Sequence, residues 1–224
     1  MRKLVLTLFA IGVMVTSYAQ AEIDTDQLAL DVSKADAANT DQLKAFIWKK
    51  ASVVSVNGEV KANTLSEFKF DDKGELQMQN IDATTSVKQK RGVRGRVQAS
   101  TAQNNIDYVE KALETMITYT YMSKGQLLDF FDKAKITEAN GIITAAGSDV
   151  FAKGDSLTVK VESATKLFLH KEFSGFMGED PISGVIEYAK FKSGVSHATT
   201  NVLSLPAKNA VINGVNQDYS QRVE

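Results

Sequence analysis

Residues 142–219 constrain the fold most, because their apolar side chains fall in short runs separated by turn residues. Val159 and Val161 alternate with charged neighbours, which is the period-two pattern of a β-strand with one buried face. Residues 167–169 and Val185-Ile186 place apolar side chains on both faces, so the sheet is expected to need cover, or a cavity, on its second side. We therefore predict an antiparallel meander over this stretch.

The first 21 residues have the three parts of an export signal. Arg2 and Lys3 precede an apolar run over residues 4–15, and Ala19-Gln20-Ala21 supplies a small-x-small cleavage site. This run is shorter than the roughly 20 residues that cross a bilayer as a helix. We expect cleavage after Ala21, which leaves residues 22–224 as a single exported domain in the periplasm.

Charge and length limit the classes of partner and fold. The 224 residues include 26 Lys and Arg against 27 Asp and Glu, and this near neutrality argues against nucleic-acid binding. Cysteine is absent, so an oxidising compartment would add no disulfides. A chain of this length buries enough surface to fold without a disulfide or a metal.

Further strands are expected before the meander. Alternating apolar residues over 46–56 lead to Asn57-Gly58, the strongest short hairpin signal in any sequence. A second alternating stretch, 68–80, is interrupted by turn residues at 71–74. Residues 22–40 indicate a weak helix or a loose lead-in. About four strands are predicted in this part.

Two helices should follow. Apolar residues spaced by three and four over 106–120 form the stripe of an amphipathic helix. Ser123 and Gln126 then have the spacing of a capping box, and the second helix should end before Asn140-Gly141. The predicted fold class is α+β, with a curved antiparallel sheet, a half-barrel-like meander, covered by two or three helices.

Catalytic patterns are incomplete. Gly154-Asp155-Ser156-Leu157 matches the nucleophile block of GDSL-type esterases, which also requires an early position in the chain and a late Asp-x-x-His. The residues three places before His170 and His197 are Leu167 and Gly194, so no base is paired with the serine. We interpret the tetrapeptide as a turn, and we predict no enzymatic activity, no metal and no cofactor.

A basic segment is the first candidate for ligand contact. Five cations lie within nine residues and are interrupted by Gly92 and Gly95. The segment is either a solvated stretch or an anion-binding loop whose backbone N–H groups and cations contact phosphate, for example at an anionic membrane surface. Its cations are Lys88, Lys90, Arg91, Arg94 and Arg96.

The second candidate is the apolar stretch 173–181, in which aromatic residues and a methionine stand between glycines. It is either a turn that caps the end of the core or a mobile lid at the mouth of a cavity, where methionine suits a ligand of variable shape. The side chains expected to contact such a ligand are Phe173, Phe176 and Met177.

Six stretches of the mature chain invite comparison with known families: Trp48, 56–61, 70–74, 90–95, 154–158 and 216–219. Together they resemble an uncharacterised family of exported bacterial proteins, which implies no activity. The chain lacks the proline-rich link of that family after the first long helix, where Tyr121-Met122-Ser123 stands instead. A signal peptide with a curved sheet and helices across it is also similar, in architecture alone, to the LolA-like half-barrel of periplasmic lipoprotein carriers and sorting factors.

The leading hypothesis is a non-enzymatic periplasmic binding protein with an apolar cavity for a lipid, an acyl chain or a lipoprotein anchor. The alternative is a structural or interaction module of the cell envelope whose core is filled. The two differ in whether the space between sheet and helices is empty.

Overall fold

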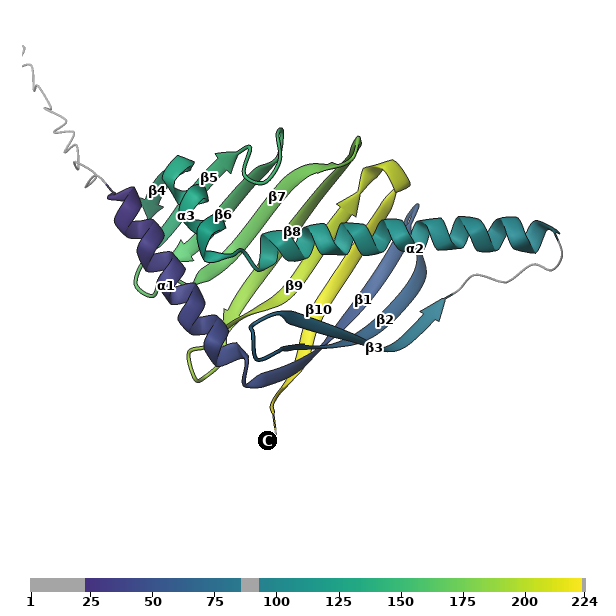
Figure 1. Cartoon of the computed structure of the whole chain (residues 1–224), viewed down its shortest axis with the longest axis horizontal. Coiled ribbons are helices and arrows are strands. Elements are labelled where there is room, and N and C mark those ends of the chain that lie inside the picture. Colours follow the sequence, from purple (N-terminus) through teal and green to yellow (C-terminus); the bar gives the residue numbers. More distant parts are fainter. Residues whose placement is uncertain (1–22, 86–92, 223–224) are drawn as a thin grey trace, which may run out of the picture.

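The computed structural model describes residues 23–85 and 93–222, with side chains for 23–84 and 107–222. All strands belong to one antiparallel sheet of ten strands, in the order β3-β2-β1-β10-β9-β8-β7-β6-β5-β4 (Figure 1). This confirms the predicted α+β class. The strands are β1 Phe46–Val56, β2 Glu59–Phe70, β3 Leu76–Thr85, β4 Lys135–Ala139, β5 Ile142–Ser148, β6 Ser156–Glu162, β7 Phe168–Met177, β8 Asp180–Lys190, β9 Ser196–Leu205 and β10 Ala210–Gln221.

Tight turns join most neighbouring strands, as the sequence predicts. Asn57 and Gly58 both have positive φ, as do Asn140 and Gly141, and these pairs close the β1–β2 and β4–β5 hairpins. The meander therefore begins one strand earlier than predicted, at β4. About four strands were expected before the helices, whereas the described residues before α2 form three, β1, β2 and β3. The last strand, β10, returns to pair with β1 and joins the two parts of the sheet.

Three α-helices and a short 3-10 helix complete the described fold: α1 Thr25–Leu43, α2 Val93–Thr120, α3 Lys124–Lys133 and η1 Pro206–Lys208. The Asp24 carboxylate accepts a hydrogen bond from the Gln27 backbone N–H at 3.0 Å, which caps α1. The predicted capping box of α3 is confirmed by both of its hydrogen bonds between Ser123 and Gln126. In the described part of the chain, no helix is both long and apolar enough to cross a membrane.

The three α-helices lie across one face of the sheet, called here the inner face (Figure 1). Helix α2 contacts β7 and β8, α3 contacts β5, and α1 packs on α3. Val185 and Val202 point to the outer face, where Val202 is 40% exposed. Among the described residues, the expected cover on this second side is therefore missing, and valine on that face is partly open to solvent.

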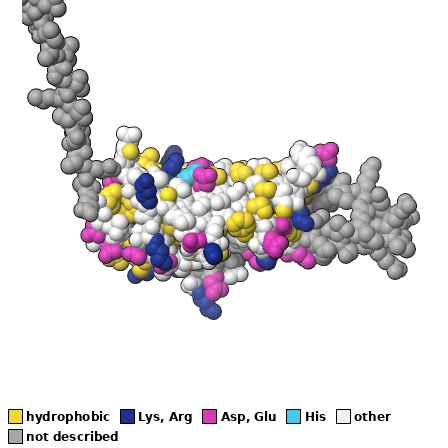
Figure 2. Space-filling model, turned by 90° about the horizontal axis from the view of Figure 1, so that it is seen from above, with side chains coloured by type: hydrophobic (Ala, Val, Ile, Leu, Met, Phe, Trp, Pro, Cys, Tyr) yellow, Lys and Arg dark blue, Asp and Glu magenta, His cyan; other side chains and the backbone are white. Residues whose placement is uncertain are grey.

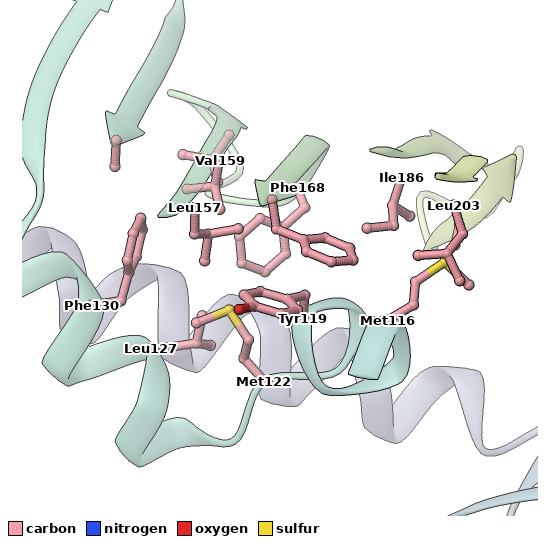
Figure 3. Packing of buried hydrophobic residues seen from close by; sticks show 14 of the residues in the cluster. Met116, Tyr119, Met122, Leu127, Phe130, Leu157, Val159, Phe168, Ile186 and Leu203 are labelled. Atoms are coloured by element: carbon pink, nitrogen blue, oxygen red, sulfur yellow. The ribbon is translucent and has the colours of Figure 1, made fainter. Parts of the chain in front are cut away.

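A large hydrophobic core, cluster one, fills the space between the helices and β5 to β10. Figure 3 shows Leu157, Val159 and Phe168 pointing from the sheet toward the side chains of α2 and α3. Tyr119 stacks on Phe173 with ring centroids 4.1 Å apart. Phe131 has no exposed surface, so this part of the interior is packed by side chains.

A smaller aromatic core, cluster two, lies at the other end of the inner face. Trp48 stacks on Phe68 and Tyr219, with centroids 6.0 and 5.5 Å apart, and Phe70 packs edge-on against Tyr121. The cluster fixes the start of β1 against the ends of β2 and β10. Two apolar clusters therefore stabilise one sheet, and the residues between them carry the polar side chains described below.

Candidate functional site

The predicted basic segment is only partly within the described residues. Lys88, Lys90 and Arg91 lie outside them. Arg94 and Arg96 are in the first turns of α2, so the prediction of a loop is wrong for residues 93–100. Cations, a glycine and small residues without an apolar stripe obscured a helix that begins well before 106. Contact of these five cations with anionic groups stays a prediction.

The three apolar residues predicted to contact a ligand do not come together. They lie on β7, and the turn that follows is only Gly178-Glu179. Phe173 is buried in cluster one beneath Tyr119, and Met177 lies on the same inner face at the strand end. Phe176 points to the outer face and is 57% exposed, because side chains alternate along a strand.

The serine of the esterase-like block is also on the outer face. The Ser156 hydroxyl hydrogen-bonds to the Ser174 hydroxyl at 2.8 Å. His170 bonds through Nδ1 to the Glu187 carboxylate at 2.8 Å. The interpretation of this block as a turn that leads into β6 is confirmed by the position of Ser156 at the start of that strand.

Two hollows among the described residues bear on ligand binding. The first, of about 30 Å³, is lined by Asp36, Tyr121, Tyr188 and His197 among others, and it is large enough for one or two water molecules. The second, of about 500 Å³, is an open depression between α1 and α3 whose floor is Leu30 and Leu128. Its rim carries Asp26, Asp129 and Asp132, a set of carboxylates that would repel an anionic ligand.

Between clusters one and two, the inner face carries a row of polar residues, called here the polar band. Strand pairing places Asn216, Lys50, Ser66 and Asn80 in line across β10, β1, β2 and β3. The next line toward cluster one runs through Asn201, Gly214, Ser52 and Thr64. Buried polar groups need hydrogen-bond partners, so this part of the inner face cannot be stabilised by apolar packing alone.

Two side chains of the polar band, Asn201 and Lys50, meet at Gly214. A Cβ atom on Gly214 would lie 2.4 Å from Asn201 Oδ1 and 2.7 Å from Lys50 Cε, so only glycine leaves room for both side chains. Asn201 is 5% exposed, and its Oδ1 has no hydrogen-bond partner. Asn216 donates through Nδ2 to the Ala198 carbonyl at 3.0 Å, while its own buried Oδ1 also lacks a partner.

Lys50 is partly buried and forms no hydrogen bond or ion pair with the described residues. Burial lowers the pKa of its ammonium group from 10.5 to about 8, and no carboxylate offsets this effect. Its described neighbours on the inner face of β10, β2 and β9 are the uncharged Asn216, Ser66 and Asn201. A cation so placed is available to an anion that can reach the inner face.

Beyond the polar band, the edge strand β3 exposes two large apolar side chains, called here the apolar rim. Met78 pairs with Phe68 on the inner face and is 55% exposed, and Ile81, the extra residue of a β-bulge, is 50% exposed. By contrast, the opposite edge strand β4 is short and begins with Lys135. Long edges with exposed apolar residues and few charges are unusual unless something covers them.

The remaining buried cation, Lys171, already has partners. Its Nζ donates to the carbonyl oxygens of Thr120 at 2.7 Å and Tyr119 at 3.3 Å, and it lies 3.9 Å from the centroid of the Phe168 ring. A cation suits the carbonyl end of a helix, so Lys171 fixes the C-terminus of α2 to the sheet. We assign it a structural role.

The surface seen in Figure 2 carries both signs of charge. Lys, Arg, Asp and Glu side chains are interspersed on this view, and hydrophobic side chains form small groups among them. Because the two signs are mixed, this face has no large region of purely positive or purely negative electrostatic potential. The unpartnered Lys50 inside the polar band is therefore the more specific electrostatic feature.

The polar band could have been found in the sequence, although it was not predicted. Trp48, Val54 and Val56 belong to the alternating apolar set that predicts this strand, and Lys50 and Ser52 have the same parity in it. A charged lysine on the otherwise apolar face that carries tryptophan and valine is the sequence signal for this band. Its neighbours Asn201 and Gly214 come from strands far away in the sequence, and only the register brings them together.

Comparison with known proteins gives distant structural likeness only. No protein-family model matches the chain, and no curated protein sequence matches it. A DUF1329 family protein from Desulfovibrio piger is similar in structure at a TM-score of 0.43 and 12% identity, over 90% of this chain and 95% of that one. A LolA superfamily protein from Nitrosomonas europaea has a TM-score of 0.35 and 10% identity, over 86% and 94%. Both likenesses have TM-scores below 0.5, so function has to be derived from the site.

Proposed function

We propose that this protein is an exported, non-enzymatic binding protein that holds an amphiphilic, lipid-like ligand on the inner face of β1, β2 and β3. The observation that carries the proposal is Met78, 55% exposed on the inner face beside the polar band, with Ile81 exposed at the bulge of the same edge strand. A ligand with an apolar chain and a polar end would cover both. Residues 1–21 supply the export signal in this proposal, and the basic segment 88–96, which follows β3 in the chain, contacts anionic lipid headgroups.

The place of binding differs from the enclosed apolar cavity expected from the sequence. Cluster one fills the space beneath α3 and the C-terminal half of α2 with side chains such as Phe130, Phe131 and Leu127. The small cavity beside Asp36 has the volume of one or two waters, too little for an acyl chain. An open surface at the β3 end therefore supports the proposal better than an internal cavity does.

Replacing both rim residues with serine should weaken binding of an uncharged amphiphile, monoolein, by about a hundredfold or more, because burial of each apolar side chain contributes about 1.5–3 kcal/mol. Calorimetric titration of the purified mature protein below the critical concentration of the ligand measures this effect. The matched control is Val215→Ser, since Val215 is 46% exposed on the outer face. This control should bind as the unmodified protein does.

Two other outcomes would contradict the proposal. The first is that Phe176→Ser loses monoolein binding while the double variant Met78→Ser/Ile81→Ser binds monoolein normally. This result would favour the lid predicted from the sequence over the apolar rim. The absence of saturable monoolein binding would favour an interaction module with a filled core. The packing of cluster one supports that second candidate, and its partner surface would be the outer face with Val202, Val211 and Val215 exposed.

A further inference from the structure

We infer that two copies of this chain associate through residues 76–80 of β3, across a two-fold axis, so that the sheet continues from one copy into the other. The interface goes beyond the proposed function. It also covers the inner face beside the apolar rim, and the use of that covered space for an amphiphile rests on the proposed function. Two observations point to a second copy as the occupant: the open edge of β3 and the part of α2 that runs past it.

The segment 76–80 is suited to pair with itself. Among the described strands, β3 has a neighbour on one side only, so its other edge offers backbone groups to a further strand. The five side chains carry no charge, and those of 77–80 are exposed. The β-bulge at Ile81 ends the regular ladder directly after the segment. The contact is therefore short, and a two-fold axis closes it at two copies.

The middle of the segment sets the register. Antiparallel pairing centred on Met78 places this residue opposite its own copy, and Gln77 of one copy lies opposite Gln79 of the other. Met78 is on the inner face and 55% exposed, so its side chain would contact the same side chain of the second copy there. No pair of like charges faces each other within the segment.

Helix α2 supplies the second observation. Its 28 residues span about 42 Å. It contacts β7 and β8, and five strand spacings, about 24 Å, separate β8 from β3. Figure 1 shows the N-terminal part of α2 running past the β3 end of the sheet. A projecting helical segment is only marginally stable without a packing surface, which indicates that another surface covers it.

One two-fold axis accounts for both features. An axis perpendicular to the sheet keeps the inner faces of the two copies on the same side, so the projecting part of α2 in one copy lies over β3 and β2 of the other. These strands carry the apolar rim, and the second copy supplies the cover that an amphiphile bound there would need. An extended peptide of another protein could pair with β3 but would leave α2 uncovered, so a second copy is the better occupant.

Sedimentation equilibrium of the purified mature protein without ligand tests the interface, and we expect a reversible dimer. The double variant Gln77→Lys/Gln79→Lys places like charges opposite each other at two pairs, so its dimer dissociation constant should rise at least about tenfold. The matched control is Thr200→Lys/Asn213→Lys, which adds the same charge at exposed outer-face positions of β9 and β10. This control should dimerise as the unmodified protein does.

The absence of cysteine from the chain allows a test of the register. Met78→Cys should form a disulfide-linked dimer under mild oxidation, because this position lies opposite its own copy. Gln79→Cys should not, because the two copies of position 79 are diagonal neighbours about 7–8 Å apart, beyond the usual reach of a disulfide.

Amide hydrogen exchange tests the position of α2. Backbone amides of residues 93–105 should be protected in the dimer and should exchange about tenfold or more faster in Gln77→Lys/Gln79→Lys, measured at the same concentration. The control Thr200→Lys/Asn213→Lys should keep the protection of the unmodified protein.

The outcomes separate the interface from the proposed function. A protein that stays monomeric and binds monoolein would overturn the interface and leave the proposed function intact. A dimer that resists the two lysines and gives no Met78→Cys linkage is formed by another surface, and the inference would again be wrong. Equal exchange of residues 93–105 in all three proteins would refute the cover by α2. If the dimer forms as described and monoolein does not bind, the interface stands and the proposed function is wrong.

Discussion

Asp155→Ala is expected to lower the free energy of unfolding by about 3–5 kcal/mol, which corresponds to a fall in melting temperature of about 10 °C. The Asp155 side chain is 2% exposed and accepts hydrogen bonds from the backbone N–H groups of Val150, Phe151 and Ala152 at 2.5, 2.9 and 3.1 Å. The Tyr119 hydroxyl donates a fourth, at 2.7 Å. Removal of the carboxylate leaves four donors without partners.

This aspartate is the central residue of the esterase-like block, so the neighbouring serine is the matched control. Ser156→Ala should change the free energy of unfolding by less than about 0.5 kcal/mol, because its hydroxyl bonds only to another hydroxyl on the outer face. Ester hydrolysis by the purified protein, if any is detected, should also be unaffected. Urea unfolding monitored by circular dichroism measures both variants, and equal stability of the two would contradict the role assigned to Asp155.

Lys171→Ala is the second large effect, and it should cost about 2–4 kcal/mol. The side chain is 1% exposed, and its Nζ satisfies two carbonyl oxygens at the C-terminus of α2. The alanine variant loses these bonds and leaves a cavity beside Phe168. Lys160→Ala, an exposed lysine on the neighbouring strand, should lie within about 0.5 kcal/mol of the unmodified protein in the same urea experiment. A Lys171→Ala variant as stable as this control would contradict the capping role.

The same lysine predicts how stability depends on pH. Burial lowers its pKa from 10.5 to about 8, although the Asp36 carboxylate acts in the opposite direction. Between these two values the unfolded chain holds a proton that the folded protein has released. Stability therefore rises with pH, by at most about 1.4 kcal/mol per pH unit for each such lysine. Lys50 contributes with the same sign.

Buried tyrosines reverse this trend at higher pH. Burial raises the pKa of Tyr119, Tyr121, Tyr188 and Tyr219 above 10.0, so above that pH the unfolded chain loses protons that the folded protein keeps. We therefore expect maximal stability near pH 10. Urea midpoints measured at intervals from pH 7 to 11 should show the rise and the fall, and Lys171→Met should have a smaller rise than the unmodified protein.

The architecture could be derived from the sequence because its signals are local. Asn57-Gly58 and the Ser123 capping box each depend on residues within one turn, and both are found as predicted. The start of α2 could not be derived in this way. Residues 93–105 alternate cations, glycine and small polar residues without an apolar stripe, so the pattern resembles a loop.

The candidate site was missed for a different reason. The parity of Lys50 with Trp48 was visible, but the meaning of that lysine depends on Asn201, Gly214 and Asn216, which β9 and β10 bring to it from the end of the chain. The pairing register between strands that are distant in the sequence cannot be derived from any short stretch of residues. Conversely, Phe176 and Met177 stood out as neighbours in the sequence, and the alternation of β7 places them on opposite faces.

The central claim is that an amphiphile occupies the inner face at the β3 end of the sheet. The most direct measurement is photo-crosslinking with a lysophosphatidylglycerol that carries a diazirine in its acyl chain, followed by peptide mass spectrometry. We expect saturable adducts on Met78, Ile81 and their neighbours in β2 and β3, competed by unlabelled lysolipid. Saturable adducts concentrated instead on outer-face residues such as Val215, or on Leu30 in the hollow between α1 and α3, would contradict the account.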